Sequence, residues 1–201
     1  MWLSQTGCIR LVLAFAGSPW YTDGMKKVIV KCKLSDKDRF EDKLADIGRE
    51  FSPIYWQHDR IYVPRGYKHG ANLPRLIMRT EVRATDMPAK YTLILRRHIE
   101  DSGIDFVEST PVTNYVEMVN IILQLGFKQQ TEISRQRQEI LMDGDQNVIY
   151  LDAVENHDGY YAKMESTMND NDSAEDIRED LRRMFASFGE KDITELAYSE
   201  Y

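Results

Sequence analysis

The sequence has little of what would indicate a metal-cluster, disulfide-rich or membrane protein. Its two cysteines, Cys8 and Cys32, lie in no CxxC pattern and in no Cys/His cluster, so neither a zinc site nor a disulfide framework has support. No apolar run reaches the roughly 18 residues of a membrane span. We therefore expect a cytoplasmic protein with no membrane partner.

The stretch 8–17, CIRLVLAFAG, comes nearest to a targeting signal. It resembles the apolar part of a secretory signal, but Arg10 lies inside the stretch and no Lys or Arg precedes it, which disfavours a cleaved signal. Met25 stands before Lys26, Lys27 and a strand pattern. We hypothesise that translation starts at Met25, and we treat residues 1–25 as an N-terminal extension.

Over most of the chain, positive and negative residues are equal in number. The formal net charge is −7, yet residues 165–201 hold eleven Asp/Glu against four Lys/Arg, and the rest of the chain is balanced. The acidity thus belongs to the C-terminal end and leaves room for an anion site elsewhere. The basic residues form no outer stripe, so we expect no nucleic-acid partner.

Hydrophobic periodicity predicts eight strands and three helices. The expected strands are 26–34, 57–63, 74–83, 90–99, 104–110, 129–142, 147–154 and 159–168. The expected helices run from Ser35 to Gly48, over 114–125, and from Ser173 to Gly189. Consecutive strands with short links are typical of antiparallel pairing. The prediction is an α+β domain over residues 26–190, followed by a polar tail, 191–201.

Most of these strands have two different faces: one is apolar, and the other carries Lys or Arg at every second residue. Solvated outer faces would explain any one strand. However, Arg dominates in the middle strands, and its planar fork suits phosphate oxygens. Ile77 and Ile94 share these faces, which is unusual for a fully wet surface. If the sheet closes into a barrel, the cations point inward and require a polyanion.

Several of these strands resemble motifs of the CYTH superfamily. This superfamily has the triphosphate tunnel fold of class IV adenylyl cyclases, thiamine triphosphatases and inorganic triphosphatases. The similar segments, in order, are HDRIY (58–62), LIMRT (76–80), YTLILRR (91–97), FVEST (106–110), LQLGF (123–127), RQR (135–137) and LDAVENHDGYYAKME (151–165). The resemblance covers about residues 26–188.

The resemblance implies an eight-stranded antiparallel β-barrel, or tunnel, with helices packed outside. It also implies a row of phosphate ligands at Lys33, Arg79, Arg96, Arg135 and Arg137. Lys31, Arg75 and Lys163 lie on the same faces and complete the predicted triphosphate-binding set. The ligands implied for Mg²⁺ or Mn²⁺ are Glu108, Asp152 and Glu165.

The chain departs from the family pattern at its acidic positions. The first-strand signature E-x-E-x-K is Ile29-x-Lys31-x-Lys33 here, and the penultimate acid of the last strand is Lys163. Ile77 replaces the first Arg of the L-R-x-R strand, where Arg75 on the same face could compensate. A lysine beside a carboxylate pair competes with a divalent metal. We therefore expect a degenerate metal site.

Three functions are compatible with this pattern. The first is a protein that binds a nucleotide or polyphosphate in a basic tunnel, with weakened or absent metal-dependent catalysis. The alternative is an active metal-dependent triphosphatase or adenylyl-cyclase-like enzyme with a rearranged acidic site at Glu81, Glu108, Asp152 and Glu165. The third is a scaffold whose cations are neutralised by Glu81, Glu139, Asp152 and Glu165. The sequence leaves the oligomeric state open and allows a homodimer.

Overall fold

The computed structural model describes residues 24–68, 73–99, 104–142, 147–191 and 193–194. The elements are β1 (Met25–Lys33), α1 (Lys37–Asp46), β2 (Tyr55–Pro64), β3 (Arg75–Val82), β4 (Lys90–Ile99), β5 (Ile104–Val112), α2 (Tyr115–Gln124), β6 (Phe127–Met142), β7 (Asn147–Val154), β8 (Tyr161–Met168), α3 (Ala174–Ser187) and β9 (Ile193–Thr194). The predicted strands and helices are all present.

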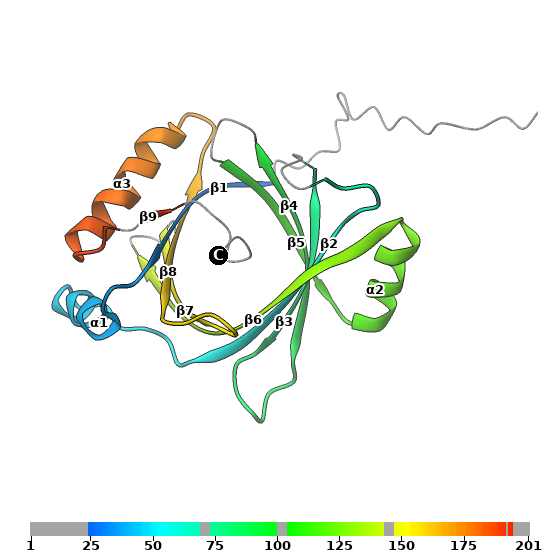
Figure 1. The fold of residues 1–201 in the computed structure, drawn as a ribbon, viewed down its shortest axis with the longest axis horizontal. Helices are drawn as coiled ribbons and strands as arrows, with labels where there is room; N and C mark the ends of the chain where they lie inside the picture. Colours follow the sequence, from blue (N-terminus) through cyan, green and yellow to red (C-terminus); the bar gives the residue numbers. More distant parts are fainter. Residues whose placement is uncertain (1–23, 69–72, 100–103, 143–146, 192, 195–201) are drawn as a thin grey trace, which may run out of the picture.

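The strands close into a barrel in which every pairing is antiparallel (Figure 1). The order is β5-β4-β3-β2-β6-β7-β8-β1, and β1 returns to pair with β5. The N-terminal part of β1 makes this closure, because Met25 to Val28 face Val107 to Ile104. Farther along the same edge, the short strand β9 pairs with Lys31 and Cys32. The predicted eight-stranded α+β barrel is confirmed, with β9 as an unforeseen addition.

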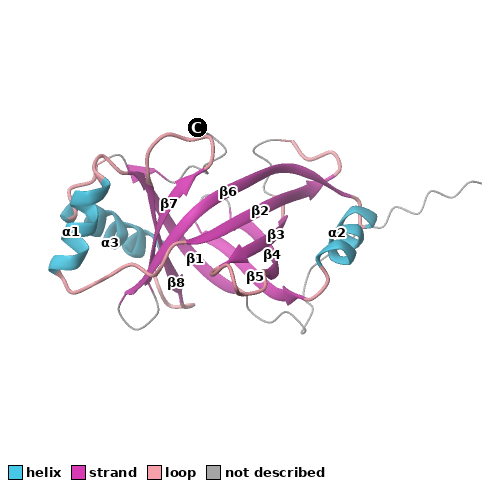
Figure 2. Ribbon diagram, turned by 90° about the horizontal axis from the view of Figure 1, so that it is seen from below, coloured by secondary structure: helices cyan, strands magenta, loops and turns pink. Residues whose placement is uncertain are grey.

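The helices lie outside the barrel at two opposite ends of the molecule, α1 and α3 at one and α2 at the other (Figure 2). The larger hydrophobic cluster joins Phe40 of α1 and Phe185 of α3 to the outer face of β1, β6, β7 and β8. The smaller cluster packs Ile122 of α2 against Tyr62 and Met78. These two clusters use the apolar strand faces, which leaves the other faces turned inward.

Several local predictions need correction. Asp36, not Ser35, caps α1, since its side chain accepts the hydrogen bond of the Arg39 amide. Ile47, inside the helix expected from Ser35 to Gly48, follows α1 and is exposed. Tyr160 lies in the expected strand 159–168, but it precedes β8 and is 40% exposed. Its ring instead lies 5.4 Å from the Lys37 ammonium.

The ends of the chain remain predictions. Residues 1–23 of the expected extension lie outside the described residues, and of the expected tail the structure describes only 191, 193 and 194. In the part of the chain that the structure describes, no helix is long and apolar enough to span a membrane.

Candidate functional site

The strand register decides which side chains face the inside of the barrel. Directly opposed residues of an antiparallel pair lie on the same face of the sheet. The register opposes Arg79 to Asp59, Arg137 to Asp152, and Lys163 to Lys31. Followed around the barrel, it places ten of the predicted site residues on the inner face: Lys31, Lys33, Arg75, Arg79, Arg96, Arg135, Arg137, Asp152, Lys163 and Glu165.

Glu108 is not brought together with the other predicted metal ligands. It stands opposite Leu95, on the outer face of β4 and β5. There it lines a cavity of about 510 Å³ together with Leu76 and Leu93. The parity of a single strand could not reveal this, because it shows which residues share a face but not which face turns inward.

Arg137 and Asp152 form a closed ion pair deep in the interior. The Arg137 Nε and Nη2 groups each donate a hydrogen bond of 2.6 Å to an Asp152 carboxylate oxygen. Both side chains are almost inaccessible, at 2% and 0% exposure. The Arg137 guanidinium also lies 4.2 Å from the centre of the Tyr150 ring and donates to Gln57. Burial has the largest single effect and raises the pKa of Asp152, but the charge and hydrogen bonds of Arg137, together with the charges of Arg135 and Lys163, lower it to about 2.

Asp59 joins two more arginines on neighbouring strands. Arg79 donates to its two carboxylate oxygens at 2.8 and 3.0 Å, and Arg135 donates to one of them at 2.5 Å. Burial alone would raise the pKa of Asp59. The adjacent Arg79 and Arg135 charges more than offset this and hold the pKa well below its usual range. One carboxylate thus compensates a pair of buried cations.

Glu165 is held between two lysines. Lys163 donates to one carboxylate oxygen at 2.5 Å, and Lys27 donates to the other at 2.9 Å. Lys163 also lies 4.3 Å from the centre of the Tyr150 ring. Burial lowers the pKa of Lys163 well below its ordinary value, although the Glu165 charge acts in the opposite direction. An anion bound nearby would therefore stabilise the charged form of Lys163.

A further group of charges lies near the end of β4 and the start of β5, where the two strands are still paired. Arg96 donates through Nε and Nη2 to one oxygen of Asp105, and the His98 ring lies 3.1 Å from the other. Arg75 stands directly opposite Arg96 in the β3–β4 register. Lys33 is more remote, because it is exposed and lies over the Tyr161 ring at 5.8 Å.

The residues at the predicted metal position do not fit a divalent ion. Both oxygens of Asp152 are taken by Arg137, and both oxygens of Glu165 are taken by lysines. Among the described residues, no three His, Cys, Asp or Glu side chains are grouped so that they could hold a metal. Mg²⁺ needs several oxygen ligands at close range, and the described carboxylates already have cationic partners there.

The sequence interpretation missed several interior residues. Gln57 and Asp59 both face inward from β2, and Asp105 faces inward from β5. None of the three was assigned a role. Tyr150, which separates Arg137 from Lys163, was missed as well. The period-two alternation could have placed Asp59 and Gln57 on one face. Their pairing partners depend on neighbours from other strands, which one strand does not show.

Comparison with solved structures identifies proteins with the same architecture. The PH1819 protein of Pyrococcus horikoshii superposes with a TM-score of 0.73 at 18% identity, covering 87% of this chain and 96% of its own. A proposed adenylate cyclase of Vibrio parahaemolyticus gives 0.72 at 18% identity, with coverages of 88% and 97%. The chain has the fold of these proteins.

A more distant match with this fold is the proposed adenylyl cyclase HpAC1 of Hippeastrum, described as having a dominant triphosphatase activity. Its TM-score is 0.56 at 10% identity, covering 88% of this chain and 93% of its own. No family model matches the sequence, and no curated protein matches it either. At such low identities the similarity establishes the barrel, and the chemistry must be inferred from the residues inside it.

Proposed function

We propose that this protein is a CYTH relative that binds a triphosphate-containing ligand, a nucleotide or a polyphosphate, inside its barrel without a metal ion. The observation that carries the proposal is the composition of the inner face. The inward cations outnumber the inward carboxylates, since Asp59 and Glu165 are each shared by two cations and Arg75 stands opposite Arg96. An interior with surplus positive charge favours a bound polyanion.

The same geometry argues for weakened or absent catalysis. A metal-dependent phosphoryl transfer requires an ion that bridges phosphate oxygens and is held by protein carboxylates. Asp152 and Glu165 are occupied by Arg137, Lys163 and Lys27, and Glu108 faces outward. Lysine ammonium groups can neutralise phosphate charge in place of a metal, but they supply no Lewis acid.

The active-enzyme alternative draws support from the activities named for the similar structures. It requires Glu165 to release its lysines and accept Mg²⁺ or Mn²⁺. The scaffold alternative draws support from the ion pairs of Asp152 and Glu139, since Arg137 and Arg83 neutralise them internally. Both alternatives make predictions that differ from those of the binding protein.

The test is thermal unfolding and calorimetry with tripolyphosphate and ATP, each in EDTA and in excess Mg²⁺ or Mn²⁺. We expect both compounds to raise the melting temperature in EDTA, because binding to the native state stabilises it. Absence of any shift with either compound would support the scaffold. Metal-dependent phosphate release that Glu165→Gln abolishes would support the enzyme.

A further inference from the structure

The cations inside the barrel differ in how far they reach solvent. The side chains of Arg135 and Arg137 are 6% and 2% exposed. Those of Arg96, Arg79 and Lys27 are 36%, 25% and 22% exposed. The inner face therefore has a sealed part and an accessible part, although both carry predicted phosphate ligands.

The sealed arginines are already hydrogen-bonded to carboxylates. Arg137 is bonded to both oxygens of Asp152, and Arg135 is bonded to Asp59. Gln57 accepts a hydrogen bond from Arg137 and donates one to Asp59. A phosphate group could reach these arginines only by separating buried ion pairs, and an uncompensated buried charge costs several kcal/mol. We therefore do not expect a ligand to displace Asp152 or Asp59.

Arg75 and Arg96 lie beyond a layer of isoleucines. Along β2, β3 and β4, the side chains of Ile61, Ile77 and Ile94 stand opposite one another on the inner face. Ile77 and Ile94 are each 7% exposed, so they fill this layer. One step toward the end of the barrel, Arg75 and Arg96 form the next opposed pair. The isoleucine layer separates these two arginines from the Asp59 cluster.

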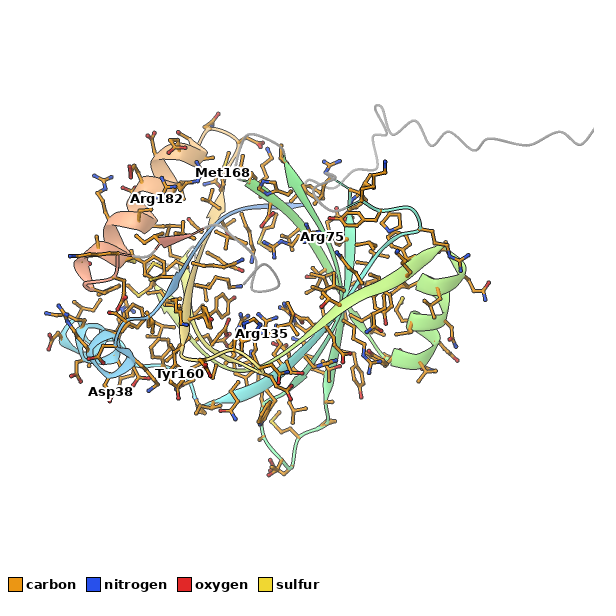
Figure 3. All side chains as sticks on the ribbon, viewed as in Figure 1. Asp38, Arg75, Arg135, Tyr160, Met168 and Arg182 are labelled. Carbon is orange, nitrogen blue, oxygen red and sulfur yellow. The ribbon has the colours of Figure 1, made fainter. Side chains whose placement is uncertain are left out.

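We call this group the rim cluster, and its members are Lys27, Arg75, Arg96, His98 and Asp105. The register connects them, because Lys27 faces Asp105, Asp105 faces His98, and Arg96 faces Arg75. Like charges directly opposed across two strands are unfavourable. Among the described residues, the Arg75 side chain has no hydrogen-bonding or ion-pair partner, and Figure 3 shows it on a different part of the ring of strands from Arg135. The rim cluster thus contains a positive charge that has no partner among the residues that the structure describes.

We propose that the rim cluster, rather than Arg135 and Arg137, holds the phosphate groups of the ligand, and that it recognises a diphosphate. This inference rests on the proposed function. Arg75 offers a whole guanidinium fork, whereas Arg96 offers Nη1, since its Nε and Nη2 bind Asp105. Two guanidinium groups suit two neighbouring phosphates. A third phosphate gains little, because the arginines beyond the isoleucine layer, Arg79, Arg135 and Arg137, are already bonded to Asp59 or Asp152.

Calorimetry in EDTA with orthophosphate, pyrophosphate and tripolyphosphate tests the length of the recognised group. We expect pyrophosphate to bind within about threefold of tripolyphosphate, and orthophosphate at least about tenfold more weakly, because one guanidinium contact is lost. Tripolyphosphate binding more than about tenfold tighter than pyrophosphate would overturn the diphosphate assignment, because it would require contacts beyond the rim.

A matched pair of variants tests the position. Arg75→Gln removes a cation that has no partner within the described ranges, so we expect an unchanged melting temperature and a loss of pyrophosphate affinity of about tenfold or more. Arg83→Gln is the control, because Arg83 follows the opposite end of β3 and binds Glu139 there. It should retain wild-type affinity. Equal effects of the two substitutions would overturn the rim assignment.

Asp105→Asn provides a test in the opposite direction. The substitution removes the carboxylate that occupies Arg96, so pyrophosphate should bind several-fold more tightly. Weaker binding in a variant that melts like the wild type would contradict the proposal.

If wild-type protein binds tripolyphosphate but Arg75→Gln binds it equally well, the proposed function survives and the rim assignment fails. If wild-type protein binds none of the probes, the proposed function itself fails.

Discussion

At the scale of single residues, Asp59 connects side chains from three strands. It accepts hydrogen bonds from Arg79, Arg135 and Gln57, and these bonds hold β2, β3 and β6 together. Asp59 is 3% exposed, so water cannot replace it as a partner. Its role explains how an interior rich in arginine can be stable without a ligand.

Asp59→Asn should destabilise the protein by about 3–5 kcal/mol, because it leaves the buried Arg135 and the partly buried Arg79 without their counter-charge. Urea unfolding monitored by circular dichroism measures the change. Asp170→Asn is the control, since Asp170 pairs with Lys26 at the surface and should lose little. A loss in Asp59→Asn no larger than in the control would show that other groups compensate these arginines.

The pH dependence of stability should carry the signature of Asp59. Its pKa is lowered by folding, despite the opposing effect of burial, because Arg79 and Arg135 favour the carboxylate. A lowered folded-state pKa contributes stability above the unfolded-state pKa of about 3.9, and that stability is lost as the pH falls below it. The stability difference between wild type and Asp59→Asn should therefore be full near pH 6 and shrink below about pH 4.

At the scale of elements, α3 supports the barrel wall that carries Lys31, Lys163 and Glu165. Phe185 is fully buried and stacks at 6.4 Å from the Phe40 ring of α1. The helix begins after the Ser173 cap, whose hydroxyl accepts from the Asp176 amide. Packing against the outer face of β1 and β8 thus fixes the direction of the charged side chains on their inner face.

Phe185→Ala should cost about 3–5 kcal/mol, because it leaves a cavity between α1, α3 and the barrel. Arg183→Ala, on the exposed side of the same helix, is the matched control and should change stability little. The urea midpoints of the two variants give the comparison. Similar midpoints would show that α3 is not part of the cooperative core.

The sequence predicted these elements well where hydrophobic periodicity was strong. The alternation in β1, β3, β4, β6 and β8 indicated the correct inner and outer faces, because one face of each had to be buried. It failed where the outcome depended on a neighbour in space. Glu108 shares no face with Glu165, since the barrel closes with that residue outward, and Tyr160 lies before the strand that was expected to contain it.

At the scale of the whole molecule, the barrel links two hydrophobic clusters that lie on opposite sides. The strand β6 spans both, because Phe127 at its start packs in the α2 cluster and Ile140 near its end packs in the α1–α3 cluster. Each barrel strand is bonded to two neighbours, and β1 closes the barrel by pairing with β5 and β8. No group of strands can therefore leave without opening the barrel.

This closure predicts a single cooperative unfolding transition. Ile122→Ala in the α2 cluster and Leu44→Ala in the α1–α3 cluster should each lower the free energy of unfolding by about 2–5 kcal/mol. In both variants the protein should still unfold in one transition. Near-ultraviolet and far-ultraviolet circular dichroism should give coincident curves in urea for the wild type and for both variants. If Ile122→Ala separated the curves into two steps, the α2 side would be an independent unit, and the ion pairs of Asp59 would not couple the two halves of the barrel.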